Sequence, residues 1–160
     1  MSKYAQRLID HINAHPEFIQ PVSRKNEMMN NFLLPGLQDL CVSRTSFKWG
    51  IPVDFDPKHV VYVWLDALFA YLSPLELEQN GTLNLAGQGN MAHFNECGIH
   101  IIGKDILRFH AVFWPAFLLS LGLPLPKMVA AHGWWTRDGQ KMSKSKGNIV
   151  NPKEVAAAYG

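Results

Sequence analysis

The chain has 160 residues, of which 48% are hydrophobic, and its formal net charge is +2 at neutral pH. This length allows one domain with a substantial core and is too short for two. The small net charge argues against a whole face that binds nucleic acid, and no apolar run is long enough to span a membrane. The first residues also lack the apolar core of a signal peptide. We therefore expect one globular unit, or part of one, in the cytoplasm.

The two cysteines, Cys41 and Cys97, are far apart in the sequence. Neither belongs to a C-x-x-C pair, and no histidine stands at the spacing of a zinc ligand. We therefore expect two buried, reduced thiols, with no disulfide and no zinc site in this segment.

Two helices are predicted near the start of the chain. Apolar side chains repeat at helical spacing through residues 3–14, as at Leu8 and Ile12. Pro21 suits the first turn of a second helix, which we expect to end near Pro35.

Three later runs have the composition of β-strands, at residues 60–64, 98–103 and 128–132. The first is continuously apolar, as in a strand that is buried on both faces. Helices are predicted over residues 67–71, behind an Asp66 cap, and over residues 106–121, with a break at Pro115. Alternation of strands and helices predicts an α/β fold, namely a partial Rossmann-like, doubly wound parallel sheet.

The remaining segments are expected to be less regular. We predict a short extended piece at 42–45, a proline-bearing loop at 52–58, an irregular excursion at 73–93, a hairpin or β-turn with Asp138-Gly139 as its turn, and a helix over 153–159 after Pro152.

The segment of residues 141–148 reads Lys-Met-Ser-Lys-Ser-Lys-Gly-Asn, and we refer to it as the lysine loop. Lysine ammoniums, serine hydroxyls and free backbone N–H groups can all donate to phosphate oxygens. A basic loop of this kind is commonly no more than a solvated surface. The five-residue string at its start, however, is expected by chance in a chain of this length with a probability of about 10⁻⁴. The loop therefore predicts a site that stabilises a departing or transferring phosphate group.

A second candidate position is the turn after the strand at 98–103. Gly103 ends this strand and is followed at once by Lys104, Asp105 and a helix. In open α/β sheets, ligands bind where a strand ends and a helix begins. Alone, this turn is a weak signal.

Together these segments resemble the methionyl-tRNA synthetases, which belong to class I of the aminoacyl-tRNA synthetases. The resemblance is carried by residues 61–67 (Val-Tyr-Val-Trp-Leu-Asp-Ala), 103–110 (Gly-Lys-Asp-Ile-Leu-Arg-Phe-His), 114–116 (Trp-Pro-Ala), 132–133 (His-Gly) and the lysine loop. It implies the second half of a catalytic domain, over residues 1–160. The family's first half, with its His-Ile-Gly-His-type motif, and its anticodon-binding domain are absent from this segment.

The resemblance implies activation of L-methionine with ATP and Mg²⁺ and transfer of methionine to tRNA(Met). It places Lys141, Lys144, Ser143, Ser145 and Arg44 in catalysis, and Gly103, Asp105, His132, Gly133, Met142 and Lys144 at ATP. It assigns the methionine pocket to Trp64, Ala67, Leu68, Tyr71, Ile106, His110 and Trp114. Aromatic and flexible apolar walls suit a polarisable thioether. Mg²⁺ would arrive with ATP, since the sequence contains no dedicated cage of oxygen ligands.

Two alternatives remain open from the sequence. The first is a class I synthetase for another amino acid. The second is a non-catalytic fragment or remnant that binds methionine or adenine nucleotide weakly, with a partly exposed apolar sheet edge that promotes self-association. Core packing is also an alternative role for each aromatic residue assigned to the pocket, and Asp105 could be a helix cap only.

Overall fold

A parallel sheet lies at the centre of the computed structural model, which describes residues 1–72 and 98–160. Its strand order is β1-β6-β5, with β1 at Ile19–Gln20, β6 at Met128–His132 and β5 at Ile99–Gly103. β5 and β6 run side by side from the pair Ile99↔Met128 to the pair Gly103↔His132. This sheet, within a mixed helix and strand architecture, confirms the α/β class and two of the three predicted strands.

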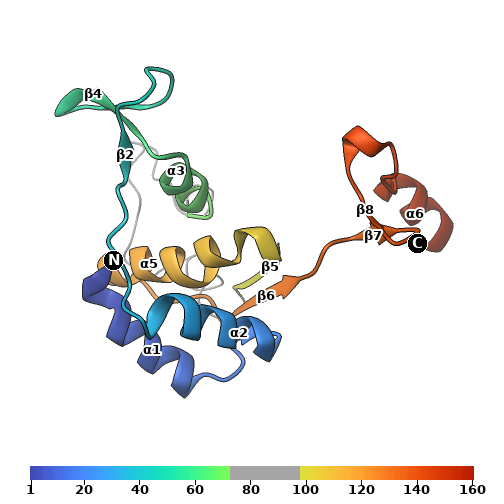
Figure 1. Ribbon diagram of the computed structural model, residues 1–160, viewed down its shortest axis with the longest axis horizontal. Helices are drawn as coiled ribbons and strands as arrows, with labels where there is room; N and C mark the ends of the chain where they lie inside the picture. Colours follow the sequence, from blue (N-terminus) through green and yellow to red (C-terminus); the bar gives the residue numbers. More distant parts are fainter. Residues whose placement is uncertain (73–97) are drawn as a thin grey trace.

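Helices from the N-terminal part of the chain and from the segment after β5 pack together around this sheet (Figure 1). The N-terminal group consists of η1 (Ser2–Tyr4), α1 (Ala5–Ala14), α2 (Val22–Met28) and η2 (Met29–Leu33). The group after β5 consists of η3 (Lys104–Ile106), η4 (Phe109–Phe113) and α5 (Trp114–Ser120). Their shared core includes Leu8, Ile12, Phe18, Trp114 and Val129, all of them 0% exposed. Burial of these apolar surfaces is the main stabilising contribution to this part of the fold.

The helix predicted over 106–121 is confirmed in outline, and its break has a local cause. η4 is a π-helical turn, and α5 begins directly after it with Pro115 in its first turn. Proline has no N–H to donate to the preceding turn, so regular α-helical hydrogen bonding is interrupted at this point, whereas proline is tolerated in the first turn of a new helix. The helices predicted over residues 3–14 and from Pro21 onward are also confirmed.

A small antiparallel sheet forms an arm that stands apart from the helical body (Figure 1). Its order is β2-β4-β3, with β2 at Ser43–Arg44, β3 at Pro52–Val53 and β4 at Asp56–Val61. β4 continues through Tyr62 into α3, which spans Val63–Phe69 and leads back toward the body.

Three predictions for this arm are wrong. The run at 60–64 ends an antiparallel strand and starts a helix, and it does not belong to the buried parallel sheet. Asp66 lies in the first turn of α3, whose N-cap is Tyr62. The expected loop at 52–58 contains β3 and the start of β4. Apolar residues suit either a strand or a helix, and only the antiparallel partners select this arrangement. The short extended piece at 42–45 is confirmed as β2.

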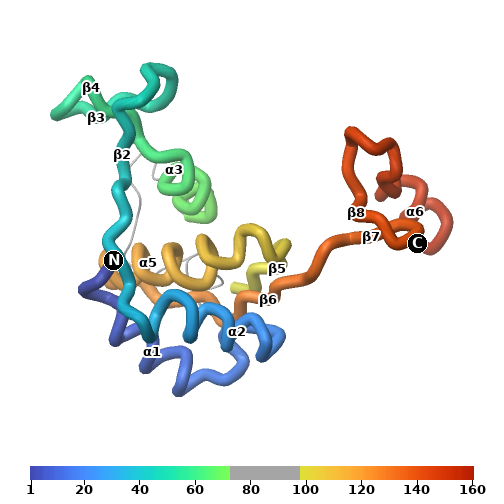
Figure 2. Tube along the Cα trace, viewed as in Figure 1, coloured from blue at the N-terminus to red at the C-terminus, as the bar shows by residue number. Residues whose placement is uncertain are grey.

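The C-terminal segment extends from the end of β6 and lies away from α1 and α2 (Figure 2). It contains β7 (Thr136–Arg137), β8 (Gln140–Lys141), η5 (Lys144–Lys146) and α6 (Pro152–Tyr159). Asp138 and Gly139, at φ 53° and 73°, form the turn between β7 and β8, which confirms the predicted hairpin. Two consecutive residues with positive φ are the requirement of the tight turn that matches the twist of a hairpin. The final helix is confirmed as well, and the Asn151 side chain accepts a hydrogen bond from the Lys153 N–H at its start.

Cys41 is exposed and free, so the prediction of a buried thiol is wrong for this residue. It lies in the extended segment before β2, where its Sγ donates to the Ser43 carbonyl. Cys97 and the excursion predicted at 73–93 lie outside the described residues. Within the residues that the structure describes, no helix is long and apolar enough to cross a membrane.

Candidate active site

The carboxyl ends of β5 and β6 open into a cavity of about 340 Å³. Parallel strands end at the same edge of their sheet, so this is where a ligand site is expected in an α/β fold. The cavity is lined by residues of both strand ends and of the hairpin that leads into the lysine loop: Gly103, Lys104, Asp105, His132, Gly133, Trp134, Trp135, Lys141, Met142 and Ile149. Six of the residues predicted for ATP binding or catalysis are therefore brought together.

The two glycines at this edge leave open space beside the backbone. A Cβ built on Gly103 would meet only the His132 ring, at 3.8 Å, and one built on Gly133 would meet nothing within 4 Å. No protein atom therefore demands glycine at either place. The absence of a side chain leaves the strand ends accessible to a bound molecule.

His132 lies at the rim and is exposed. Its Nδ1 is 2.8 Å from the Gly133 carbonyl oxygen and 3.2 Å from the Trp135 Nε1. Because the indole N–H can only donate and the carbonyl can only accept, the two contacts require opposite states of the same nitrogen. One contact therefore forms at a time in the neutral ring.

The lysine loop is closed by one amide side chain. Asn148 accepts from the Ser143 N–H through its Oδ1, at 2.9 Å, and donates to the Lys141 carbonyl through its Nδ2, at 3.2 Å. The hydroxyls of Ser143 and Ser145 are 3.2 Å apart, and the Met142 N–H donates to the Trp135 carbonyl at 2.8 Å. These bonds link the loop to itself and to the hairpin.

Lys141 and Met142 line the cavity, whereas the lining does not include Ser143, Lys144 or Ser145. Lys144 and Ser145 are exposed in η5. In the described part of the chain, no carboxylate oxygen lies within 4.0 Å of the Lys144 ammonium. Its charge is therefore available to an anionic ligand.

A cluster of aromatic side chains connects α3 with the helices after β5. The Tyr71 hydroxyl lies 2.8 Å from the His110 Nε2, and the His110 Nδ1 lies 2.9 Å from the Ile106 carbonyl oxygen. A carbonyl only accepts, so the proton of a neutral His110 is on Nδ1 and the Tyr71 hydroxyl donates to Nε2. Burial lowers the pKa of His110, and the bond to the Ile106 carbonyl partly opposes this effect. Burial also raises the pKa of Tyr71.

Other predicted pocket residues surround this pair. The Trp64 ring stacks on Phe109 at 3.8 Å and meets His110 edge-on at 6.2 Å, and Trp114 lies 6.0 Å from Tyr71. Leu68 and Trp114 are 0% exposed, so both are packed in the core in this structure. Ala67, by contrast, faces solvent.

Arg44 lies in the arm and not at the cavity formed by the strand ends. Its guanidinium stacks on the Tyr62 ring at 4.0 Å and donates to the carbonyls of Cys41 and Ser43. Among the residues that the structure describes, Arg44 therefore has local partners only, and its predicted catalytic role stays a prediction.

Sequence reasoning missed several residues of these two sites. Trp134 and Trp135 line the cavity, Asn148 closes the loop, and His100 of β5 meets Tyr71 at 4.6 Å and His110 at 5.7 Å. Burial, and secondarily the charge of His110, lowers the pKa of His100 to about 4. The sequence signal for the tryptophans is their position between a strand-ending glycine and the lysine loop.

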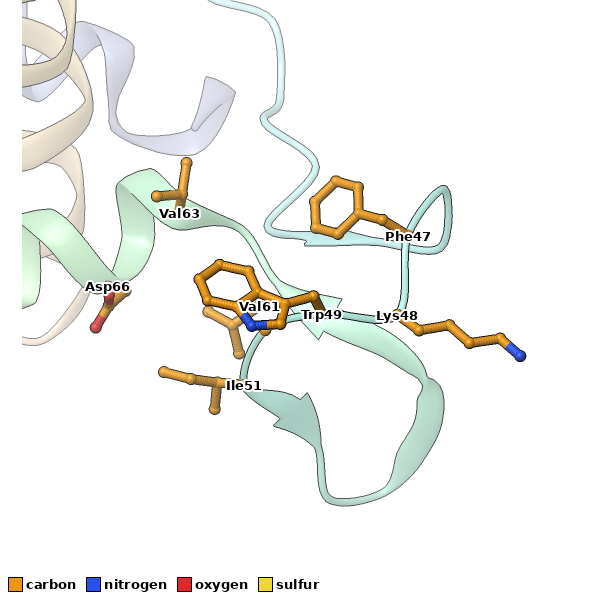
Figure 3. A pocket seen from close by; sticks show the side chains of 8 residues that line it. Phe47, Lys48, Trp49, Ile51, Val61, Val63 and Asp66 are labelled. Atoms are coloured by element: carbon orange, nitrogen blue, oxygen red, sulfur yellow. The ribbon is translucent and has the colours of Figure 1, made fainter.

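A larger cavity, of about 650 Å³, lies on the arm (Figure 3). It is bordered mainly by apolar side chains, among them Phe47, Trp49, Ile51 and Val63, with Asp66 at one side. It contains none of the predicted site residues. The size of a cavity alone therefore does not indicate where the predicted catalytic and binding residues lie.

A family model described as "tRNA synthetases class I (M)" matches residues 1–160. The chain belongs to this family. It is 59% identical over 160 residues to a methionine–tRNA ligase of Clostridium perfringens and 52% identical over 160 residues to one of Listeria monocytogenes. In these comparisons it covers 100% of its own length and 24% and 23% of theirs. This class I synthetase chain thus spans about a quarter of the length of these relatives.

Solved structures of the same family have the same fold. The Mycobacterium tuberculosis methionyl-tRNA synthetase bound by methionyl-adenylate matches with a TM-score of 0.78 and 45% identity, over 99% of this chain and 30% of that one. The apo form of the same synthetase matches with a TM-score of 0.70 over 83% of this chain and 26% of that one. The resemblance to methionyl-tRNA synthetases that the sequence motifs indicated is confirmed.

Proposed function

We propose that residues 1–160 form one part of the catalytic domain of a methionine–tRNA ligase. In this role, the chain supplies walls of the methionine pocket and the loop that binds the leaving pyrophosphate. The observation that carries the proposal is the cavity at the ends of β5 and β6, where Lys141 and Met142 of the lysine loop meet Gly103 and His132. A cationic loop beside open strand ends suits the binding of a nucleoside triphosphate.

The first reaction would join methionine to ATP. A carboxylate oxygen of methionine attacks the α-phosphorus of Mg-ATP, the bond from that phosphorus to the β-bridging oxygen breaks, and pyrophosphate leaves. No protein nucleophile is required, so the protein contributes positioning and charge stabilisation. Lys141 and Lys144 would neutralise the pyrophosphate, and the hydroxyls of Ser143 and Ser145 would donate to it. The adenosine would lie beside Gly103, Asp105, His132 and Gly133.

Methionine would be held by the cluster around Tyr71 and His110. The hydroxyl of Tyr71 and both nitrogens of His110 are engaged within the protein, so the cluster offers mainly aromatic surface. A thioether forms only weak hydrogen bonds and gains from contact with aromatic rings, which makes such a surface suitable for it. Ala67 and Ile106 would complete the walls.

The acyl group would then pass to a hydroxyl at the 3′ end of tRNA(Met), with release of AMP. Mg²⁺ would enter with ATP as part of the substrate. Among the described residues, no group of three or more His, Cys, Asp or Glu side chains gathers in a way that could hold a metal ion. The compartment we propose for this activity is the cytoplasm.

Methionine-dependent ATP/pyrophosphate exchange tests the catalytic proposal directly. We expect exchange from the chain and from Lys153→Ala, a control that removes a lysine of α6 outside the loop. Lys144→Ala should lower the exchange at least about tenfold, which corresponds to about 1.4 kcal/mol of transition-state stabilisation. Equal, measurable rates of exchange for the two variants would contradict the role of the lysine loop.

A second candidate function is binding without catalysis, and the apolar side chains exposed on the edge strand β5 favour it. Ile99 and Ile101, which are 52% and 76% exposed on the edge strand β5, would then promote self-association. This candidate predicts no exchange from folded chain, heat of binding with methionine but not with leucine, and concentration-dependent sedimentation. Absence of both exchange and methionine binding would contradict both candidates.

A further inference from the structure

Two lysines from different elements meet at one tryptophan ring in the cavity of the strand ends. The ammonium of Lys141, at the end of β8, lies 3.0 Å from the ring centroid of Trp134, and that of Lys104, at the start of η3, lies 5.0 Å from it. All three residues line the same cavity of about 340 Å³. The Trp134 ring is 43% exposed, so it is not a core residue.

No nearby carboxylate in the described part of the chain holds these two positively charged ammonium groups together. Within residues 1–72 and 98–160, neither ammonium lies within 4.0 Å of a carboxylate oxygen, although Asp105 borders the same cavity. Two lysine side chains with free rotation would separate in water to reduce their repulsion. The negative face of the indole ring attracts each ammonium and opposes that separation.

We infer that Trp134 is a positioning residue that holds the ammonium groups of Lys104 and Lys141 at the cavity before an anion binds. An incoming pyrophosphate or triphosphate then meets two charges that are already in place, and less side-chain freedom is lost on binding. The inference rests on the proposed function for the identity of the anion, but the arrangement of the two lysines does not depend on it.

The adjacent tryptophan has a different arrangement. The Trp135 ring lies edge-on to His132, at 6.0 Å and 82°, and its N–H points to that histidine. In the described part of the chain, no lysine or arginine lies over the Trp135 ring. Of these two tryptophans, only Trp134 contacts the two lysines. An aromatic ring at this edge of the sheet is therefore not sufficient for the contact.

Calorimetric titration with pyrophosphate at low salt tests the consequence for binding. Trp134→Leu should raise the Kd about 3- to 10-fold, while Trp134→Phe, which keeps an aromatic face, should raise it less. Trp49→Leu is the matched control, because that indole is 90% exposed on the arm. In a Lys141→Met background, Trp134→Leu should have a clearly smaller effect, since one of the two ammoniums is gone. The same fold-change in both backgrounds would overturn the inference.

A measurement without ligand separates this inference from the proposed function. The Lys141 ammonium lies over the Trp134 ring, 3.0 Å from its centroid, so we expect the adjacent ε-methylene protons to experience the ring current and to give NMR signals shifted upfield. Trp134→Leu should return these signals to ordinary lysine values. If the shift is present but the wild-type chain does not bind pyrophosphate, the phosphate site is contradicted and the positioning role stands. Ordinary signals in the wild type would overturn the positioning role itself.

Discussion

Removal of the Tyr71 hydroxyl is expected to destabilise the aromatic cluster by an amount that can be worked out from the contacts. In Tyr71→Phe, the Nε2 of His110 loses the donor that lies 2.8 Å away. His110 is 2% exposed, and an acceptor left unpaired in such a place costs about 1–3 kcal/mol. Tyr71 itself is 37% exposed, so water can partly replace the hydroxyl. We therefore expect the free energy of unfolding to fall by about 1–2 kcal/mol.

Urea denaturation at pH 7.5 measures this loss, and Tyr159→Phe provides the matched control. Tyr159 is 88% exposed on α6, so removal of its hydroxyl should change the free energy of unfolding by less than about 0.5 kcal/mol. Exchange and methionine binding should be measured on the same two variants. If Tyr71→Phe loses more free energy of methionine binding than free energy of unfolding, the hydroxyl belongs to the methionine pocket.

The pKa of His110 gives a second, independent readout. Burial is the main cause of the lowered pKa of His110, and the bond to the Ile106 carbonyl opposes it. The bond from the Tyr71 hydroxyl requires an unprotonated Nε2, so we expect it to favour the neutral ring as well. Its removal should raise the pKa of His110 toward the ordinary value, as followed by NMR titration. If Tyr71→Phe matches Tyr159→Phe in stability and leaves the pKa of His110 unchanged, the tautomer and the direction of this hydrogen bond are assigned incorrectly.

Three further predictions concern the core, the lysine loop and pH. Trp114→Leu should lower the free energy of unfolding by about 2–4 kcal/mol because its side chain is 0% exposed, whereas Trp49→Leu, at a side chain 90% exposed, should change it by less than about 0.5 kcal/mol in the same thermal unfolding experiment. Asn148→Ala should speed hydrogen exchange of the Ser143 amide about tenfold or more, because that amide loses its acceptor at 2.9 Å; an unchanged rate would show that the loop is closed in another way. The pKa of His100 is about 4 in the folded chain, because of burial first and a neighbouring histidine second, against 6.5 in the unfolded chain. The unfolded chain therefore binds more protons between these values, and the free energy of unfolding should fall by about 1–2 kcal/mol from pH 7.5 to pH 5. His100→Gln should remove most of that dependence, and an unaltered pH profile would contradict the assignment.

Much of the fold was predictable because its signals are local. Helical periodicity around Leu8 and Ile12, a proline in a first turn and glycines at strand ends each depend on a few neighbouring residues. The strand β1 was missed because a segment of two residues has no pattern of its own; it is a strand only through its pairing with Val129 and Ala130 of β6. The run at 60–64 was assigned wrongly because its apolar composition suits a strand and a helix equally well.

The sequence by itself also predicted the chemistry of the candidate site. The lysine loop and the strand-ending Gly103 predict a phosphate site without knowledge of how the chain folds, because the donors that suit a phosphate are properties of the residues themselves. Only the tertiary structure decided which residues meet. It brings Lys104 and Lys141 to one indole ring, aligns Tyr71 with His110 across two elements and leaves Arg44 in the arm. These outcomes depend on contacts between segments that are distant in the chain, and such contacts are selected by the packing of the whole chain rather than by any local pattern.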